Sequence, residues 1–102
     1  MDTQFKKGVL DICVLSVLDK EEMYGYGLKI EMQKIMDVNE NTLYPLLRRL
    51  EKDELLDTSS HISEQGRIRK YYNITEKGKN RLIELKEEWK QFKSIVDDML
   101  SI

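Results

Sequence analysis

The chain has 102 residues and a formal net charge of −2, with 40% hydrophobic and 35% charged side chains. This balance predicts one helix-rich folded domain and excludes an intrinsically disordered chain. No apolar run approaches the roughly 20 residues that span a bilayer, and no secretory leader is recognisable, so we expect a cytoplasmic protein without a membrane partner. The acidic balance weighs against nucleic-acid binding, unless the positive charges gather on one surface.

The first expected element is a helix from about Phe5 to Asp19, which is apolar on nearly every side. A helix with this pattern is buried all round, so we expect a second subunit to cover what its own domain leaves open. Cys13 lies inside this segment, and as the only cysteine it cannot form an intrachain disulfide. We interpret it as a small buried hydrophobic residue rather than a redox sensor.

Two further helices are expected next. Gly25 and Gly27 mark a turn or the start of the second helix, whose apolar residues recur at helical spacing to about Met36. The third helix begins at Asn39, a favourable N-cap, and is expected to run to about Leu55. Leucines form its apolar stripe, whereas the opposite face and its flanks carry Asn41, Tyr44, Pro45, Arg48, Arg49 and Lys52.

A β-hairpin is expected between Leu55 and Ile74. Glu64-Gln65-Gly66 is a turn signal, and after it Ile68, Tyr72 and Ile74 alternate with polar residues, which predicts that these three share one face. Thr75 then caps one long helix that extends to about Leu100. Its apolar residues recur every three or four positions, as in a coiled-coil seam, and form the predicted dimer interface: Leu82, Leu85, Trp89, Phe92, Val96 and Met99.

Three helices, a hairpin and a long helix, in this order, predict a mainly α protein with a small β-hairpin. We expect a winged helix-turn-helix domain over residues 1–74 and a dimerisation helix over residues 75–102. In this fold the third helix enters the major groove of DNA, and the hairpin, or wing, lies along the backbone or a minor groove.

The side chains of the third helix suit such contacts. Arg48 can pair with a guanine edge or a phosphate, and Asn41 can read adenine. Hydroxyls of Thr42 and Tyr44 can donate to phosphate oxygens, to which Arg49 and Lys52 add charge. An ordinary solvated helix face is the competing interpretation, because Glu51, Asp53 and Glu54 follow closely.

The wing strengthens the DNA interpretation. Arg67, Arg69 and Lys70 are clustered just after the glycine turn, where mobile cations can settle against a phosphate backbone. A chance cluster of charges is the alternative. Basic residues on both elements, at the separation that the fold requires, favour a double-stranded DNA partner.

A family resemblance supports this interpretation. Asn41-Thr42-Leu43-Tyr44-Pro45-Leu46-Leu47-Arg48-Arg49-Leu50-Glu51 resembles the recognition helix of PadR-family transcriptional regulators. Gly66-Arg67-Ile68-Arg69-Lys70-Tyr71-Tyr72-Asn73-Ile74-Thr75-Glu76-Lys77-Gly78 resembles their wing and following helix start, and Tyr24-Gly25-Tyr26 the start of their second helix. The similarity covers about Gly8 to Met99, and the single C-terminal helix resembles the compact branch of the family.

The resemblance implies a homodimer that represses transcription at an operator with two-fold symmetry and that leaves DNA when a small aromatic or hydrophobic inducer binds. In compact multidrug-responsive relatives, a tryptophan at the position matching Trp89 stacks flat ligands between the subunits. Phe5, Ile12 and Phe92 are then candidates to line the same site, although Trp89 as a simple filler of the dimer core stays open. The family usually has glycine where this chain has Glu54, so how the third helix ends, with a left-handed residue or otherwise, stays open.

Other functions have less support. A winged-helix adaptor that contacts proteins and has lost DNA binding is the main alternative, and the overall acidity motivates it. His61 has no second histidine or spaced partner for a metal site, so we expect it exposed or against the DNA backbone. No phosphate loop or nucleophile–base pair is recognisable, so neither an enzyme nor a cofactor is expected.

Overall fold

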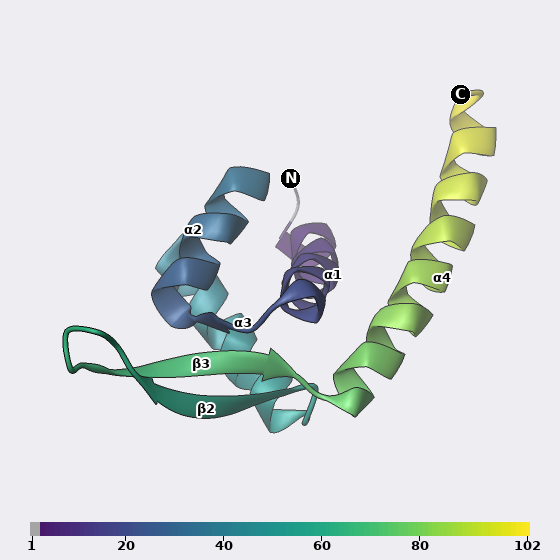
Figure 1. The fold of residues 1–102 in the computed structure, drawn as a ribbon. Coiled ribbons are helices and arrows are strands. Elements are labelled where there is room, and N and C mark those ends of the chain that lie inside the picture. Colours follow the sequence, from purple (N-terminus) through teal and green to yellow (C-terminus); the bar gives the residue numbers. More distant parts are fainter. Residues whose placement is uncertain (1–2) are drawn as a thin grey trace.

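The computed structural model describes residues 3–102, with side chains from Gly8 onward. The elements follow one another as α1 (Thr3–Lys20), β1 (Met23–Tyr24), α2 (Gly25–Ile35), α3 (Glu40–Lys52), β2 (Leu56–Ile62), β3 (Ile68–Ile74) and α4 (Glu76–Leu100). Three helices lie on one side of the β2–β3 hairpin, and α4 leaves the other end of the hairpin and extends away from the rest (Figure 1). The molecule measures 56 × 27 × 21 Å. The predicted fold class, a winged helix-turn-helix with a long C-terminal helix, is confirmed.

The sheet has one strand more than the sequence predicted. Its order is β1-β3-β2, and β1 pairs antiparallel with β3 through Met23 opposite Tyr72 and Tyr24 opposite Tyr71. Two residues are too few to show an alternating pattern, so periodicity could not reveal this strand. Through β1, the connection between α1 and α2 is fixed to the middle strand of the sheet.

The core lies between the three N-terminal helices and the sheet. Its fully buried side chains are mostly leucines, and they come from α1, α2, α3 and the start of β2: Leu10, Val14, Leu15, Leu28, Met32, Leu43, Leu47, Leu50 and Leu56. Cys13 packs at the edge of this core, and burial raises the pKa of its thiol, which favours the uncharged form. The face of α1 that carries Val9 and Ile12 is only half-buried within the chain.

One predicted interface residue belongs to this core instead. Leu82 of α4 is only 2% exposed and packs with the buried leucines of its own domain. It therefore offers almost no surface to a partner subunit, unlike the other residues predicted for the dimer interface. The first turns of α4 pack on their own domain before the helix extends away from it. The row of apolar residues on α4 that is left open to a partner therefore begins after Leu82.

The two caps predicted from the sequence are present. Asn39 Oδ1 accepts a hydrogen bond from the Thr42 amide at 3.1 Å, and Thr75 Oγ1 accepts one from the Gly78 amide at 2.9 Å. Each cap satisfies one of the amides that lack a partner inside the first turn of a helix. The starts of α3 and α4 are therefore set by local side chains.

The end of α3 differs from the prediction. The helix stops at Lys52, and Glu54 adopts a left-handed conformation with φ of 64°. The Leu55 amide donates to Leu50 O at 2.9 Å and the Glu54 amide to Glu51 O at 3.0 Å, which is the Schellman pattern. Leu55 thereby turns back into the core beside Leu50. The sequence left this helix end open, and the structure shows a left-handed one at a non-glycine residue, where the burial of Leu55 offsets the cost of the conformation.

The end of α3 is also bonded to the start of α4. Thr75 Oγ1 donates to Glu54 O at 2.7 Å, and the Thr75 amide donates to Leu55 O at 3.1 Å. Gly78 is buried against the same Leu55 carbonyl. We call Glu54, Leu55, Thr75 and Gly78 the α3–α4 junction. It couples the helix predicted to read DNA directly to the helix predicted to mediate dimerisation.

Candidate nucleic-acid interface

The outer face of α3 is open to solvent. Five of the side chains predicted to contact DNA are exposed on it: Asn41, Thr42, Pro45, Arg48 and Lys52. Tyr44 is half-buried and packs against the core beside Gly25, which leaves part of its ring accessible. Leu43, Leu46, Leu47 and Leu50 hold the opposite face against the core, so the outer face is presented in a fixed orientation.

An ion pair fixes the start of α3 to α2. Lys29 Nζ contacts Glu40 Oε1, and the hydrogen bond from this pairing raises the pKa of Lys29. Glu40 lies in the first turn of α3, where a negative charge also suits the helix dipole. The two helices of the helix-turn-helix are thus joined at the end of α3 that carries Asn41.

Arg49 is engaged within the chain. Its guanidinium lies 2.6 Å from Asp11 Oδ1 of α1 and 3.9 Å from Asp53 Oδ2. Both Arg49 and Asp11 are largely shielded from solvent, so this pair holds α3 against α1. Sequence reasoning could not identify this partner, because Asp11 is distant in the chain and lies in a mostly apolar stretch of α1.

The wing presents its cations in three different ways. Arg67 follows Gly66, which has φ of 79°, and its side chain is exposed at the turn. Arg69 lies over the ring of Tyr24 in β1, 4.5 Å from its centroid. Lys70 Nζ lies 3.6 Å from Glu51 Oε1 of α3. The wing is therefore tied to β1 through Arg69 and to α3 through Lys70, while Arg67 projects from the turn.

Several exposed lysines of the described chain form no ion pair with an acidic residue: Lys20, Lys77, Lys79, Lys86 and Lys90. Among the residues predicted to contact DNA, three cations are likewise exposed and unpaired: Arg48, Lys52 and Arg67. Two of them lie on the outer face of α3 and the third at the wing turn. Their charge is available for phosphates or guanine edges, because no intrachain carboxylate neutralises it.

His61 is exposed, as predicted. Its Nε2 lies 3.1 Å from Ser59 Oγ and 3.5 Å from Glu22 Oε1, and its ring meets the edge of Tyr71. Tyr71 in turn packs beside Tyr24. These aromatic contacts connect β2, β3 and β1 on one face of the sheet, and sequence reasoning did not find them. Within the described residues no three histidine, cysteine or acidic side chains gather as a metal site would require.

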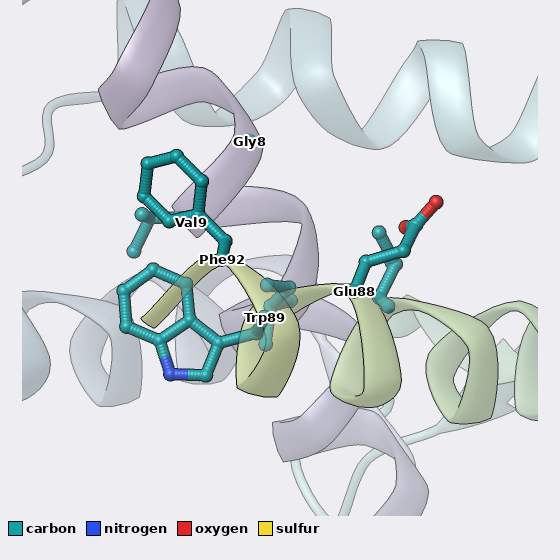
Figure 2. Close-up of a pocket in the computed structure, with 7 residues that line it drawn as sticks. Gly8, Val9, Glu88, Trp89 and Phe92 are labelled. Carbon is teal, nitrogen blue, oxygen red and sulfur yellow. The ribbon is translucent and has the colours of Figure 1, made fainter. Parts of the chain in front are cut away.

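A separate pocket lies between α1 and α4. Its volume is about 270 Å³, and it is lined by Gly8, Val9, Ile12, Leu85, Glu88, Trp89 and Phe92. Figure 2 shows the rings of Trp89 and Phe92 side by side, with Val9 of α1 next to Phe92. The ring centroids of Trp89 and Phe92 are 6.1 Å apart. Three of the four residues predicted to line a ligand site are thus brought together, and the fourth, Phe5, lies outside the described side chains.

From this pocket toward its C-terminal end, α4 exposes a line of apolar side chains. Trp89, Phe92 and Met99 are exposed and Val96 is half-buried, and the C-terminal part of α4 extends away from the rest of the chain (Figure 1). Ile95 and Ile102 widen the apolar surface. No helix among residues 3–102 is both long and apolar enough to cross a membrane.

A helix-turn-helix whose second helix exposes Arg48 and Lys52, followed by a wing that exposes Arg67, defines a winged-helix DNA-binding regulator. Comparison with known proteins then gives the family. Residues 14–84 match the transcriptional regulator PadR-like family. The chain belongs to this family, as the motifs of α3 and of the wing predicted.

Individual relatives agree over nearly the whole chain. A PadR-like transcriptional regulator from Bacillus cereus shares 39% identity, with a TM-score of 0.85 and coverage of 96% of this chain and 97% of that one. A PadR-like transcription factor from Bacteroides fragilis shares 39% identity, with a TM-score of 0.81 and 95% coverage of both chains. An uncharacterised protein of Lysinibacillus sphaericus is 36% identical over 95 residues, covering 89% of this chain and 87% of its own length.

Proposed function

We propose that this DNA-binding regulator acts as a homodimeric repressor of transcription. Residues 1–74 form the DNA-reading domain, and residues 75–102 form the dimerisation helix. The observation that carries the DNA contact is the set of unpaired, exposed cations on both α3 and the wing turn. Arg48 and Asn41 reach base edges in the major groove, Lys52 contacts a flanking phosphate, and Arg67 contacts the adjacent minor groove or backbone.

The winged-helix adaptor has less support. That function requires Arg48, Arg67, Arg69 and Lys70 to be scattered or neutralised by acidic neighbours. Only Lys70 meets one of these neighbours, Glu51, whereas Arg48 and Arg67 are unpaired among the described side chains. Repression then follows most simply from occupation of the operator, since a bound dimer blocks the polymerase from the same DNA.

The apolar surface of α4 supports the homodimer. Leu85, Trp89, Phe92, Val96 and Met99 follow one another at heptad spacing, and the half-buried face of α1 lies beside them. Exposed apolar surface of this extent is rare on a protein that functions as a monomer. A two-fold operator presents its half-sites about 34 Å apart, so two copies paired through α4 and α1 must hold their α3 helices at this spacing in order to bind it.

A charged residue introduced into this apolar row of α4 tests the proposed dimer interface. Met99 is 80% exposed, so Met99→Glu leaves the folded domain intact but brings two carboxylates together between paired α4 helices. We expect a monomer in light scattering at micromolar concentration and a loss of operator affinity of at least about tenfold, because like charges repel and each half-site then binds alone.

Ile83→Glu provides the matched control. Ile83 is 65% exposed on the opposite face of α4, so the same substitution adds the same charge away from the seam. This variant should stay dimeric and bind DNA as the wild type does. A Met99→Glu protein that is still a dimer would contradict the proposed α4 interface.

The pocket between α1 and α4 is the proposed inducer site. Its lining is apolar except for Glu88, and the rings of Trp89 and Phe92 offer flat faces for stacking. Because both lining helices also belong to the proposed interface, a second subunit would enclose the pocket. A flat hydrophobic ligand bound there would touch the proposed dimer interface directly. It could then change how the two subunits pair and so weaken operator binding.

Fluorescence tests this site, since Trp89 is the only tryptophan. Titration with a planar hydrophobic dye that does not intercalate into DNA should quench the emission and lower operator affinity over the same concentration range. In Trp89→Leu the dye should no longer affect operator affinity, although the protein still binds DNA. If a broad panel of planar compounds gives no quenching, Trp89 fills the dimer core and binds no inducer.

A further inference from the structure

Two isoleucines at the tip of the wing are exposed to solvent. Ile62 ends β2 and Ile68 begins β3, and the two are direct cross-strand partners. They are 76% and 75% exposed. The alternating pattern predicted that Ile68 and Tyr72 lie on one face of the strand, and the register confirms this. Tyr72 is buried and Ile68 is exposed, because the tip of the hairpin extends beyond the helices (Figure 1).

The register shows toward which side this pair points. Ile62 and Ile68 share a hairpin face with Leu56 and Tyr72, which are buried in the core, because side chains alternate along each strand. Lys70 lies on the same face, and its Nζ is 3.6 Å from Glu51 of α3. The isoleucines are thus on the α3 side of the wing. A duplex read by α3 and contacted by Arg67 passes along this side.

The tip that carries the pair is well ordered by its own hydrogen bonds. The Ser63 amide donates to Arg67 O at 2.7 Å, and the Gly66 amide donates to Ser63 O at 2.9 Å. The Arg67 amide donates to Ser63 Oγ at 3.2 Å. Two β-branched side chains on this closed turn have few rotamers, so they form a stiff apolar edge directly beside an exposed arginine.

We propose that Ile62 and Ile68 form an apolar wedge that enters the DNA minor groove beside each half-site. This inference depends on the proposed DNA interface and adds a contact that its cations do not make. The walls of the minor groove are deoxyribose C–H groups, and apolar side chains inserted there pack on the sugars or between base steps. Arg67, next to Ile68, meets the negative potential at the groove edge, which is strongest where A·T pairs narrow the groove.

Threonine substitutions test the wedge, because threonine keeps the β-branch that suits a strand and removes apolar surface. The probe is the duplex that the wild-type protein selects from a random-sequence pool. Ile62→Thr with Ile68→Thr should lower affinity for this duplex about tenfold or more. The slope of affinity against salt should not change, since no phosphate contact is lost.

Two control proteins separate the wedge from other effects. Ile83→Thr alters an exposed isoleucine on α4 and should retain wild-type affinity. Ile62→Val with Ile68→Val keeps most of the apolar surface and should retain most of the affinity. Thermal unfolding at equal protein concentration shows that all these variants are folded.

A base analogue locates the contact in the minor groove. Replacing adenines under the wing by 2,6-diaminopurine adds an amino group to the minor groove and leaves the major-groove edge unchanged. The wild type should lose affinity for the modified duplex, whereas the double threonine variant should lose distinctly less, since only Arg67 of its wing tip still meets the changed groove. Such non-additivity between protein and DNA changes is the signature of direct contact.

The outcomes are distinguishable. Full affinity of the double threonine variant, or equal sensitivity of both proteins to diaminopurine, would overturn the wedge. Arg48→Ala is run beside them on the same duplex. If Arg48→Ala also binds normally, the DNA interface itself is misplaced, whereas loss in Arg48→Ala alone refutes only the wedge.

Discussion

Replacing Arg48 and Arg67 by alanine together is expected to abolish operator binding while leaving the fold intact. Both side chains are exposed and lack an ion-pair partner among the described side chains, so their removal exposes no buried charge and breaks no intrachain contact. Each contributes a phosphate or guanine contact, and a dimer loses each contact twice. We expect affinity to fall at least about 100-fold, and its dependence on salt to become less steep.

The control must remove equal charge elsewhere. Arg81 and Lys93 of α4 form ion pairs with Glu84 and Asp97. Alanine at both positions changes the net charge by the same amount, so the long-range attraction between protein and DNA is the same in both double variants. Operator affinity of this control should stay near the wild-type value. Electrophoretic mobility shifts or anisotropy at several salt concentrations make the comparison. Equal affinity of the two double variants would show that Arg48 and Arg67 do not contact DNA.

Arg49 offers an internal contrast on the same helix. Its pairing with Asp11 at 2.6 Å assigns it to the joint between α3 and α1. Removing it leaves a shielded carboxylate without its partner, so the effect should fall on stability more than on the salt dependence of DNA binding. Adjacent arginines in one motif are thus given different tasks by their positions on the helix.

Gly78→Ala should destabilise the fold strongly, although alanine is the better helix former. A Cβ at Gly78 would collide with Leu55 O and lie 2.8 Å from Ile74 Cγ1. Leu55 O already accepts the Thr75 amide, so it cannot withdraw without losing that bond. Helix propensity alone favours alanine by about 1 kcal/mol. We expect the collision to reverse this and to lower the free energy of unfolding by about 2–3 kcal/mol.

Gly8→Ala is the matched control for this prediction. Gly8 also lies in a helix, but nothing lies within 4 Å of the position its Cβ would occupy. The same substitution should therefore stabilise the protein slightly. Urea unfolding at one fixed protein concentration measures both, since the stability of a dimer depends on concentration. A Gly78→Ala protein as stable as Gly8→Ala would refute the close packing at the junction.

The features that the sequence predicted well depend on neighbouring residues. Asn39 and Thr75 start helices because each side chain bonds an amide three positions away, and the turn before β3 follows from Gly66. The basic and leucine faces of α3 follow from helical periodicity. These patterns are complete within a few residues, so they can be interpreted without knowledge of the rest of the fold.

The features that it missed depend on segments distant in the chain. Arg49 meets Asp11, Gly78 meets Leu55, and Leu82 fills the core of its own domain. The exposure of Ile68 could not be predicted for the same reason, since alternation determines the face of a strand but not whether a helix covers it. Glu54 shows the limit most clearly, because the packing of Leu55 overrides the local preference of a glutamate.

The α3–α4 junction determines which spacing of half-sites the proposed dimer can bind. Because Thr75 bonds both Glu54 and Leu55, α3 cannot swivel without carrying the start of α4 with it. Each α4 is a rod of about 37 Å, close to the length of one turn of the double helix. In the proposed dimer, the distance between half-sites then depends on how the two α4 helices cross, and not on the α3 helices. A ligand bound beside Trp89, as proposed, would lie at that crossing, so it would change the spacing between the two α3 helices and leave the base contacts of each one unchanged.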